Sequence, residues 1–229
     1  QRAALEWLRE QERAGIDIVG DGEQFRIHFV HGFLESLEGI DWNLKTPMGI
    51  RNNRYIAEVP TVTAPLKRRA AVHVADAAFM RSQTTRALKV TLPGPMTICD
   101  TLADAHYGRR ADMALRFAEM LNEEALELEA AGADVIQFDE PAFHVFLEEV
   151  RDWGLPALER AMQGLKATTV VHICYGYGIQ ANIDWKNTLG EEWRQYEKVF
   201  PALAASSIKQ VSLECIHSRV PADLMALLE

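Results

Sequence analysis

A histidine and a cysteine two positions apart are the residues of this sequence best suited to chemistry. They lie in TTVVHICYGYG, residues 168–178, which reads as a β-strand carrying His172 and Cys174 at its end. Side chains alternate between the faces of a strand, so these two share a face, and an imidazole with a thiol makes half of a zinc site. A second strand-like run, IKQVSLEC at 208–215, places Glu214 as a third candidate ligand. From the pair alone, a core histidine beside a small buried thiol is an equally good interpretation.

Carboxylates end two further strand-like runs. Glu23 lies in GDGEQF, and Asp139 and Glu140 precede Pro141. Carboxylates that converge at one edge of a sheet bind an amine, act as a general base, or accept hydrogen bonds from helix N-termini. Taken singly, each of these acids is an ordinary strand-end residue.

Other charged residues and the remaining cysteines are interpreted as structural. Five glutamates are predicted to form a solvated helix face, namely Glu119, Glu123, Glu124, Glu127 and Glu129. Two basic groups are predicted to lie at the surface, namely Arg51 with Arg54, and the run Lys67-Arg68-Arg69. Cys99 is predicted to be a small buried residue. Cys215 follows a strand residue on the opposite face, so we expect it in the core, facing the helices.

Composition narrows the class of protein. The 229 residues are 48% hydrophobic, which is enough to bury a core without disulfides. A net charge of −9 argues against nucleic acid or an anionic membrane as a partner, because both need a concentrated basic face. No apolar run reaches about eighteen residues, so we expect a soluble protein with a small-molecule substrate. Three cysteines without framework spacing indicate reduced thiols and a cytoplasmic location.

Nucleotide and hydrolase motifs are missing from the sequence. It has no GxGxxG after a strand, no Walker loop, no GxSxG and no HExxH. Hydride transfer, nucleotide hydrolysis and serine hydrolysis therefore lack their usual parts.

Strands and helices alternate along the chain. Strand-like runs begin near 16, 88, 134, 169 and 208, and apolar spacing predicts helices that include 110–131 and FVHGFLESL. The run 50–65 is rich in β-branched residues but broken by prolines, which predicts a hairpin-like insertion near 46–86. Strand–helix alternation predicts parallel β/α units, either a (β/α)8 barrel or a doubly wound sheet.

Polar residues within the strands favour the barrel. Gln137 and Asp139 share one face of their strand, as do Gln210, Ser212 and Glu214 of another. A doubly wound sheet is apolar on both faces, whereas a barrel strand turns one face inward and ends in the active site.

We therefore predict one α/β domain over residues 1–229, a (β/α)8 TIM barrel that is incomplete in this chain. A whole barrel needs about 250 residues. The sequence also begins without Met, inside a predicted helix. We expect it to be part of a longer protein, with the first strand and the last two strands outside it.

Five motifs in fixed order resemble one family. GDGEQFRIHFV, LPGPMTI, IQFDEPA, VVHICYG and VSLE are similar to the cobalamin-independent methionine synthases, in particular the short, core-type single-barrel versions. The resemblance implies zinc held by His172, Cys174 and Glu214, and homocysteine bound through its amino group by Glu23 and Asp139. The family's fourth ligand, a later cysteine, has no counterpart here. A free thiol has a pKa of about 8.5, and coordination to a cation deprotonates it, so the metal would create the nucleophile.

The methyl donor and two alternative functions stay open. The long enzymes carry a tryptophan that stacks on folate after the GPxTI motif, whereas residues 94–101 here contain no aromatic side chain. The donor is therefore methyl-folate or another carrier, such as a corrinoid. One alternative is a zinc methyltransferase for another thiol, such as coenzyme M, whose sulfonate end has no ammonium. The other is a non-catalytic metal-binding barrel subunit that supports a partner protein.

Overall fold

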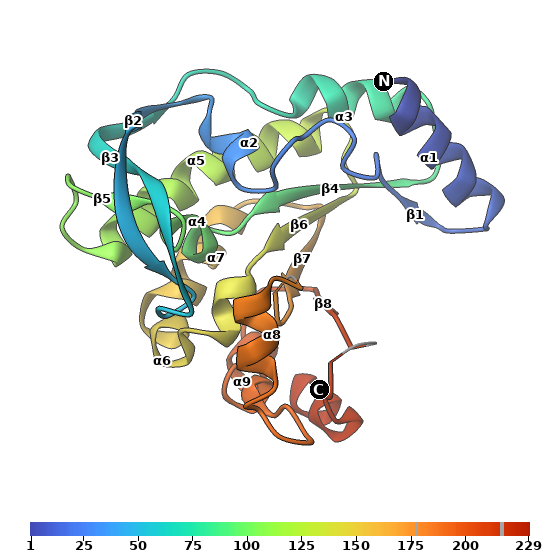
Figure 1. The fold of residues 1–229 in the computed structure, drawn as a ribbon. Helices are drawn as coiled ribbons and strands as arrows, with labels where there is room; N and C mark the ends of the chain where they lie inside the picture. Colours follow the sequence, from blue (N-terminus) through green and yellow to red (C-terminus); the bar gives the residue numbers. More distant parts are fainter. Residues whose placement is uncertain (177, 216–217) are drawn as a thin grey trace.

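Five parallel strands form the main sheet of the protein. The computed structural model describes residues 1–176, 178–215 and 218–229. The sheet order β1-β4-β6-β7-β8 follows the chain, and each strand pairs in parallel with the next. The strands span Ile18–Val19, Ala87–Pro93, Val135–Asp139, Thr168–Ile173 and Gln210–Leu213. The five predicted strands are confirmed, and they form the curled sheet of an incomplete barrel (Figure 1).

Helices connect the strands along the chain. The longer ones are α1 (Arg2–Arg13), α3 (Val74–Arg81), α5 (Arg110–Ala130), α7 (Leu155–Met162) and α8 (Gln180–Lys186). Shorter ones are α2 (His31–Leu34), α4 (Pro95–Cys99), α6 (Leu147–Glu149) and α9 (Phe200–Ala204), with 3-10 helices η1 (Pro141–His144), η3 (Gln195–Lys198) and η4 (Ala222–Leu228) and the π-helical η2 (Val150–Gly154). Within the described ranges, none of these helices combines the length and apolarity that crossing a membrane requires.

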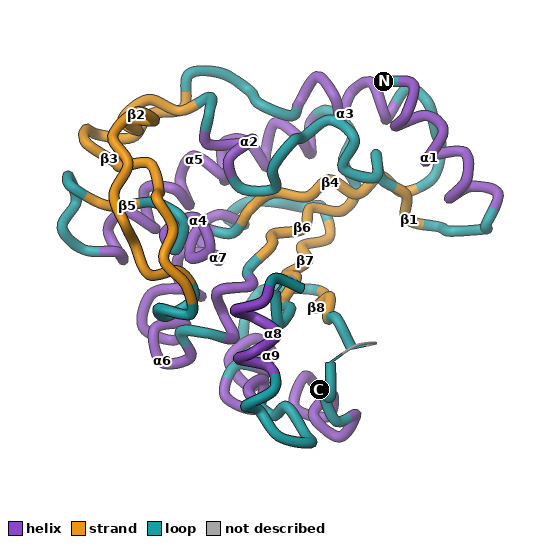
Figure 2. The backbone as a smooth tube through the Cα atoms, viewed as in Figure 1, coloured by secondary structure: helices purple, strands orange, loops and turns teal. Residues whose placement is uncertain are grey.

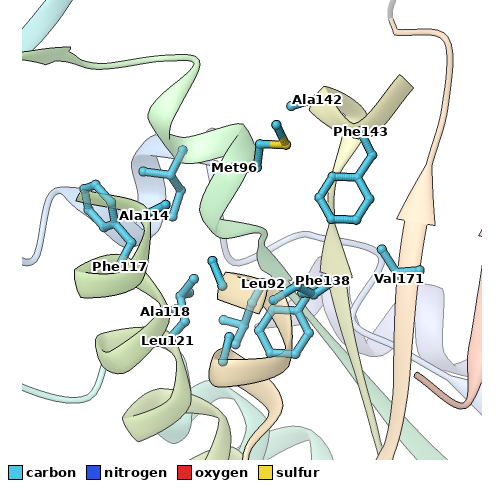
Figure 3. Close-up of a cluster of buried hydrophobic side chains, with 14 of the residues drawn as sticks. Leu92, Met96, Ala114, Phe117, Ala118, Leu121, Phe138, Ala142, Phe143 and Val171 are labelled. Carbon is cyan, nitrogen blue, oxygen red and sulfur yellow. The ribbon is translucent and has the colours of Figure 1, made fainter. Parts of the chain in front are cut away.

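Helix α5 forms the centre of the core. Its apolar residues recur at helical spacing, and Leu121 lies toward Leu92 of β4 and Phe138 of β6, while Phe117 belongs to the same buried cluster (Figure 3). These side chains are fully buried, and each such burial contributes about 1.5–3 kcal/mol. The helix ends where Gly132 takes a φ of +102°, a conformation that favours glycine.

A long hairpin stands beside the main sheet. Strands β2 (Leu37–Ile50) and β3 (Tyr55–Arg68) pair in antiparallel fashion, and β3 pairs in parallel with β5 (Ala103–Asp104), which gives the separate second sheet of Figure 2. The helix predicted around FVHGFLESL is wrong in extent, since α2 has one turn and the chain already pairs as a strand at Leu37. The assignment of residues 1–229 to one domain stays a prediction.

The base of the hairpin buries an ion pair that the sequence predictions placed at the surface. The side chain of Arg68 is 7% exposed and that of Glu124, on α5, is 0% exposed, and they lie 2.5 Å apart. Glu124 also accepts hydrogen bonds from the backbone N–H groups of Val72 and His73 at the start of α3. The surface prediction is therefore wrong for both residues, because the hairpin covers this face of α5.

The two cysteines outside the candidate site have different environments. Cys99 is buried, as predicted, and burial raises the pKa of its thiol. Cys215 is exposed, so its predicted core position is wrong. Strand β8 ends at Leu213, and the alternation of faces no longer applies two residues beyond a strand.

Candidate active site

A cavity of about 590 Å³ opens at the C-terminal ends of the parallel strands. Its wall includes four of the five residues proposed from the sequence, Glu23, Asp139, His172 and Cys174. They follow or end β1, β6 and β7, and parallel strands bring their C-terminal ends to one edge of a sheet. Glu214, the fifth, follows β8, and the cavity wall on that strand is formed by Ser212.

His172 is the last inward-facing residue of β7. Its register neighbours are Asp139 on β6 and Ser212 on β8. Nδ1 of His172 lies 3.1 Å from Oγ of Ser212, a hydrogen bond that fixes the plane of the imidazole ring. With Nδ1 engaged in this way, Nε2 is the nitrogen that can serve a ligand in the cavity.

Cys174 follows the end of β7 and turns toward the same cavity. Burial raises the pKa of its thiol, and the backbone N–H of Gly176 acts in the opposite direction. The loop that follows β7 is anchored by the buried side chain of Tyr175. The ring centroid of Tyr175 lies 4.9 Å from that of Trp193 and 5.0 Å from that of Tyr196. This aromatic anchor holds the loop so that residue 174 faces the cavity.

Asp139 ends β6 beneath the cavity. It is buried and accepts a 2.8 Å hydrogen bond from Nε2 of Gln137, whose Oε1 accepts one from Nζ of Lys89. Burial raises the pKa of Asp139, while the Gln137 hydrogen bond and the charges of His172 and Arg26 lower it. The carboxylate is thus held in place by an amide, and the guanidinium of Arg26 lies near it.

Glu23 lies in the turn after β1, and Arg26 joins it to Asp139. The backbone of Glu23 has a φ of +60°, and its N–H donates to Oδ1 of Asp21 at 3.0 Å. Nη2 of Arg26 lies 2.6 Å from Oε1 of Glu23 and 3.8 Å from Oδ2 of Asp139. Sequence reasoning missed Arg26, and its position three residues after Glu23 is the signal that could have found it.

The tip of the hairpin forms part of the cavity wall. Arg51 pairs with the buried carboxylate of Asp100, after α4, and lines the cavity. Arg54 stacks over the ring of Trp185 on α8 at 3.3 Å, and burial lowers its pKa to about 10. The prediction that Arg51 and Arg54 lie at the surface is wrong, because the hairpin folds back over the strand ends.

Glu140, next to Asp139, points away from the cavity. It is fully buried, and its carboxylate accepts hydrogen bonds from the backbone N–H groups of Met96 and Thr97 and from Oγ1 of Thr97. Its pKa is raised to about 7. Burial causes the rise, and the three hydrogen bonds offset part of it. Of the alternatives open for the strand-end acids, Glu140 thus binds a helix N-terminus, that of α4.

The donor chemistry of the cavity fits zinc in part. An imidazole and a thiol share it, and the hydrogen bond between Nδ1 of His172 and Oγ of Ser212 is the type of contact that orients a metal-ligating histidine. Across residues 1–176, 178–215 and 218–229, no three His, Cys, Asp or Glu side chains gather closely enough to hold a metal ion. The set His172, Cys174 and Glu214 therefore stays a prediction.

Comparison with known proteins defines the class. The family model described as the cobalamin-independent synthase, catalytic domain, matches residues 1–178, and the chain belongs to this family. A solved B12-independent methionine synthase from Shewanella sp. W3-18-1, in complex with selenomethionine, is 58% identical, with a TM-score of 0.94 over 99% of this chain. This agreement confirms the predicted (β/α)8 barrel, of which the chain forms part.

Curated relatives point to the same family. Methionine synthases from Saccharolobus solfataricus and Sulfolobus acidocaldarius are each 33% identical over 175 residues, or 76% of this chain. The chain spans about half the length of these relatives, 52% and 50%, and 66% of the solved chain from Shewanella.

Proposed function

We propose that the protein transfers a methyl group to the sulfur of homocysteine and so forms methionine. The observation that carries the proposal is the pair of carboxylates, Glu23 and Asp139, that share one cavity with His172 and Cys174 in a chain of this family. The two carboxylates would bind the ammonium end of the amino acid. Its sulfur would then extend toward His172 and Cys174, since all four side chains border one space.

The second part of the proposal concerns the metal. His172 and Cys174 would hold zinc, together with Glu214 after β8. When bound, zinc supplies the charge that keeps a substrate thiol deprotonated at neutral pH. Ser212 would hold the imidazole of His172 in orientation through Nδ1. Asp139, fixed by Gln137, would orient the substrate, and orientation of reactants supplies much of the rate enhancement in such reactions.

The methyl donor would approach from the hairpin side of the cavity. Ile50, Arg51 and Tyr55, at and beside the tip of the hairpin, line the same cavity as the carboxylates. Methyl-folate or another methyl carrier remains the proposed donor, and a partner protein that delivers it is compatible with an open cavity. A cytoplasmic location remains an expectation from the free cysteines. The acid pair favours an amino-acid thiol over coenzyme M, whose sulfonate would meet two like charges.

The test removes one proposed metal ligand. We expect Cys174→Ser to strip zinc from the purified full-length protein and to abolish methionine formation, because a serine hydroxyl is a far weaker zinc ligand than a thiolate. Cys215→Ser is the matched control, since Cys215 is exposed and lies outside the cavity wall. The proposal is wrong if Cys174→Ser keeps stoichiometric zinc and full methionine formation in an assay with a panel of methyl donors.

A further inference from the structure

Among the ion pairs of the described residues, Arg26 is the one cation that pairs with both Glu23 and Asp139, the carboxylates of the proposed amine site. Its side chain is 7% exposed although it lies in a surface turn between β1 and α2. Nη1 donates a 3.2 Å hydrogen bond to the carbonyl oxygen of Thr91 on β4. The guanidinium group is therefore fastened to the main sheet, and it does not move freely with the turn.

Nη2 of the same side chain faces the acids. It lies 2.6 Å from Oε1 of Glu23 and 3.8 Å from Oδ2 of Asp139. It is buried, yet no acceptor in the described part of the chain meets it with hydrogen-bond geometry. Contact without a well-directed hydrogen bond leaves both carboxylates with lone pairs for another donor.

Glu23 needs this support more than Asp139 does. The Asp139 side chain is 11% exposed and already accepts a hydrogen bond from Gln137, whereas the Glu23 side chain is 56% exposed. An exposed glutamate on a turn samples several rotamers, and restricting them costs about 1–2 kcal/mol of side-chain entropy. The electrostatic attraction of a buried guanidinium 2.6 Å away reduces this freedom before the substrate arrives.

Charge balance points the same way. Glu23 and Asp139 carry two negative charges, and Arg26 supplies one positive charge, so the group as a whole carries a single negative charge. One ammonium group neutralises it. Without Arg26, two carboxylates would face one another at the cavity wall, and mutual repulsion would drive the mobile Glu23 outward into solvent.

We propose that Arg26 is a positioning residue of the amine site, which holds Glu23 beside Asp139 and limits the site to one positive charge. This inference rests on the proposed binding of the homocysteine ammonium by Glu23 and Asp139. Arg26 acts through these two carboxylates and does not itself contact the sulfur. Its loss should therefore weaken recognition of the ammonium end and leave the reacting end unchanged.

The experiment compares two thiols that differ at one group. L-homocysteine carries the ammonium, and 4-mercaptobutyrate has the same chain without it. We expect Arg26→Met in the zinc-loaded full-length protein to raise the Kd and KM for L-homocysteine about tenfold, equivalent to about 1.4 kcal/mol. The kcat for L-homocysteine and the Kd for 4-mercaptobutyrate should change less than about twofold. Arg26→Lys, which retains the charge, should recover part of the affinity.

Controls separate the possible failures. Arg69→Met removes an exposed arginine paired with Glu38 on the outside of the hairpin, and it should leave all constants unchanged. If Arg26→Met weakens both thiols equally, or if Arg26→Lys is no better than Arg26→Met, Arg26 has only a structural role and the inference is overturned. A third outcome is that the wild type binds L-homocysteine more tightly than 4-mercaptobutyrate, that Arg26→Met loses this preference, and that neither protein forms methionine. In that case the inference stands and the proposed reaction fails. If the wild type binds both thiols equally, the amine site and the inference fail together.

Discussion

Replacing Gly94 by alanine tests how the ends of β4 and β6 are joined above the core. A Cβ atom added at Gly94 would lie 2.1 Å from Cδ of Glu140. The carboxylate cannot retreat without breaking its hydrogen bonds from Met96 N at 2.9 Å, Thr97 N at 2.8 Å and Thr97 Oγ1 at 2.7 Å. The alanine methyl group and the cap on α4 therefore exclude one another.

The expected loss follows from the three donors. Above its pKa of about 7 Glu140 is ionised, so unfolding is followed at about pH 8.5. A hydrogen bond to a charged acceptor contributes about 1.5–3 kcal/mol, and the three share one carboxylate, so their contributions are not additive. We expect Glu140→Ala and Gly94→Ala each to lower the free energy of unfolding by about 3–5 kcal/mol. In the double mutant the added methyl group has nothing to displace, so its cost should be close to that of Glu140→Ala alone.

The assay is urea unfolding of the full-length protein, followed by circular dichroism, for the wild type, both single mutants and the double mutant. The free energies should show a coupling between the two sites equal to the Gly94→Ala loss, about 3–5 kcal/mol. Gly178→Ala is the matched control, because no described atom other than those of its chain neighbours lies within 4 Å of a Cβ at that position. Additive losses in the double mutant would refute the reasoning, as would a Gly94→Ala loss no larger than that of the control.

Two further predictions concern buried charges. Burial and neighbouring positive charge lower the pKa of His31 from 6.5 to about 4, so the unfolded chain binds the extra proton and stability falls as the pH drops from 6.5 toward 4. Because His31 is only half-buried and its charge is screened by solvent, His31→Phe should remove about 1–2 kcal/mol of the stability difference between pH 7 and pH 4.5, and an unchanged difference contradicts this account. Arg51→Met removes the main ion-pair partner of the buried carboxylate of Asp100 and leaves only Arg110, 3.7 Å away. The free energy of unfolding should therefore fall by about 2–4 kcal/mol. A loss below about 0.5 kcal/mol would show that the Arg51–Asp100 pair is unimportant for stability.

The strands and the strand-end residues were predictable because they depend on local patterns. Alternating polar and apolar residues fix which face of a strand turns inward, and parallel pairing then brings the ends together. This reasoning placed Asp139, His172 and Cys174 at one edge, and the structure has all three in one cavity. Their proposed chemical roles rest on the ordered motifs, because spacing alone left core residues as an equal alternative.

The residues that sequence analysis misplaced depend on contacts between distant segments. Glu124 has the helical spacing of a solvated residue, and it is buried because the hairpin brings Arg68 to it across 56 positions of the chain. Arg51 likewise meets Asp100 across 49 positions. Neither partner is visible in a helical or strand period, because periodicity reports which face is buried and not which segment buries it.

The turn after β1 shows how a motif combines backbone and chemical requirements. Asp21 accepts the N–H of Glu23, and Gly22 and Glu23 both take positive φ, +64° and +60°, which reverses the chain directly after the strand. Glycine suits the first of these positions, while a glutamate with positive φ is a strained residue that needs a compensating contact. Arg26 provides that contact at 2.6 Å and is itself fixed to β4. The spacing of GDGEQFR is thus the spacing at which a left-handed turn returns an arginine to the glutamate that it must hold.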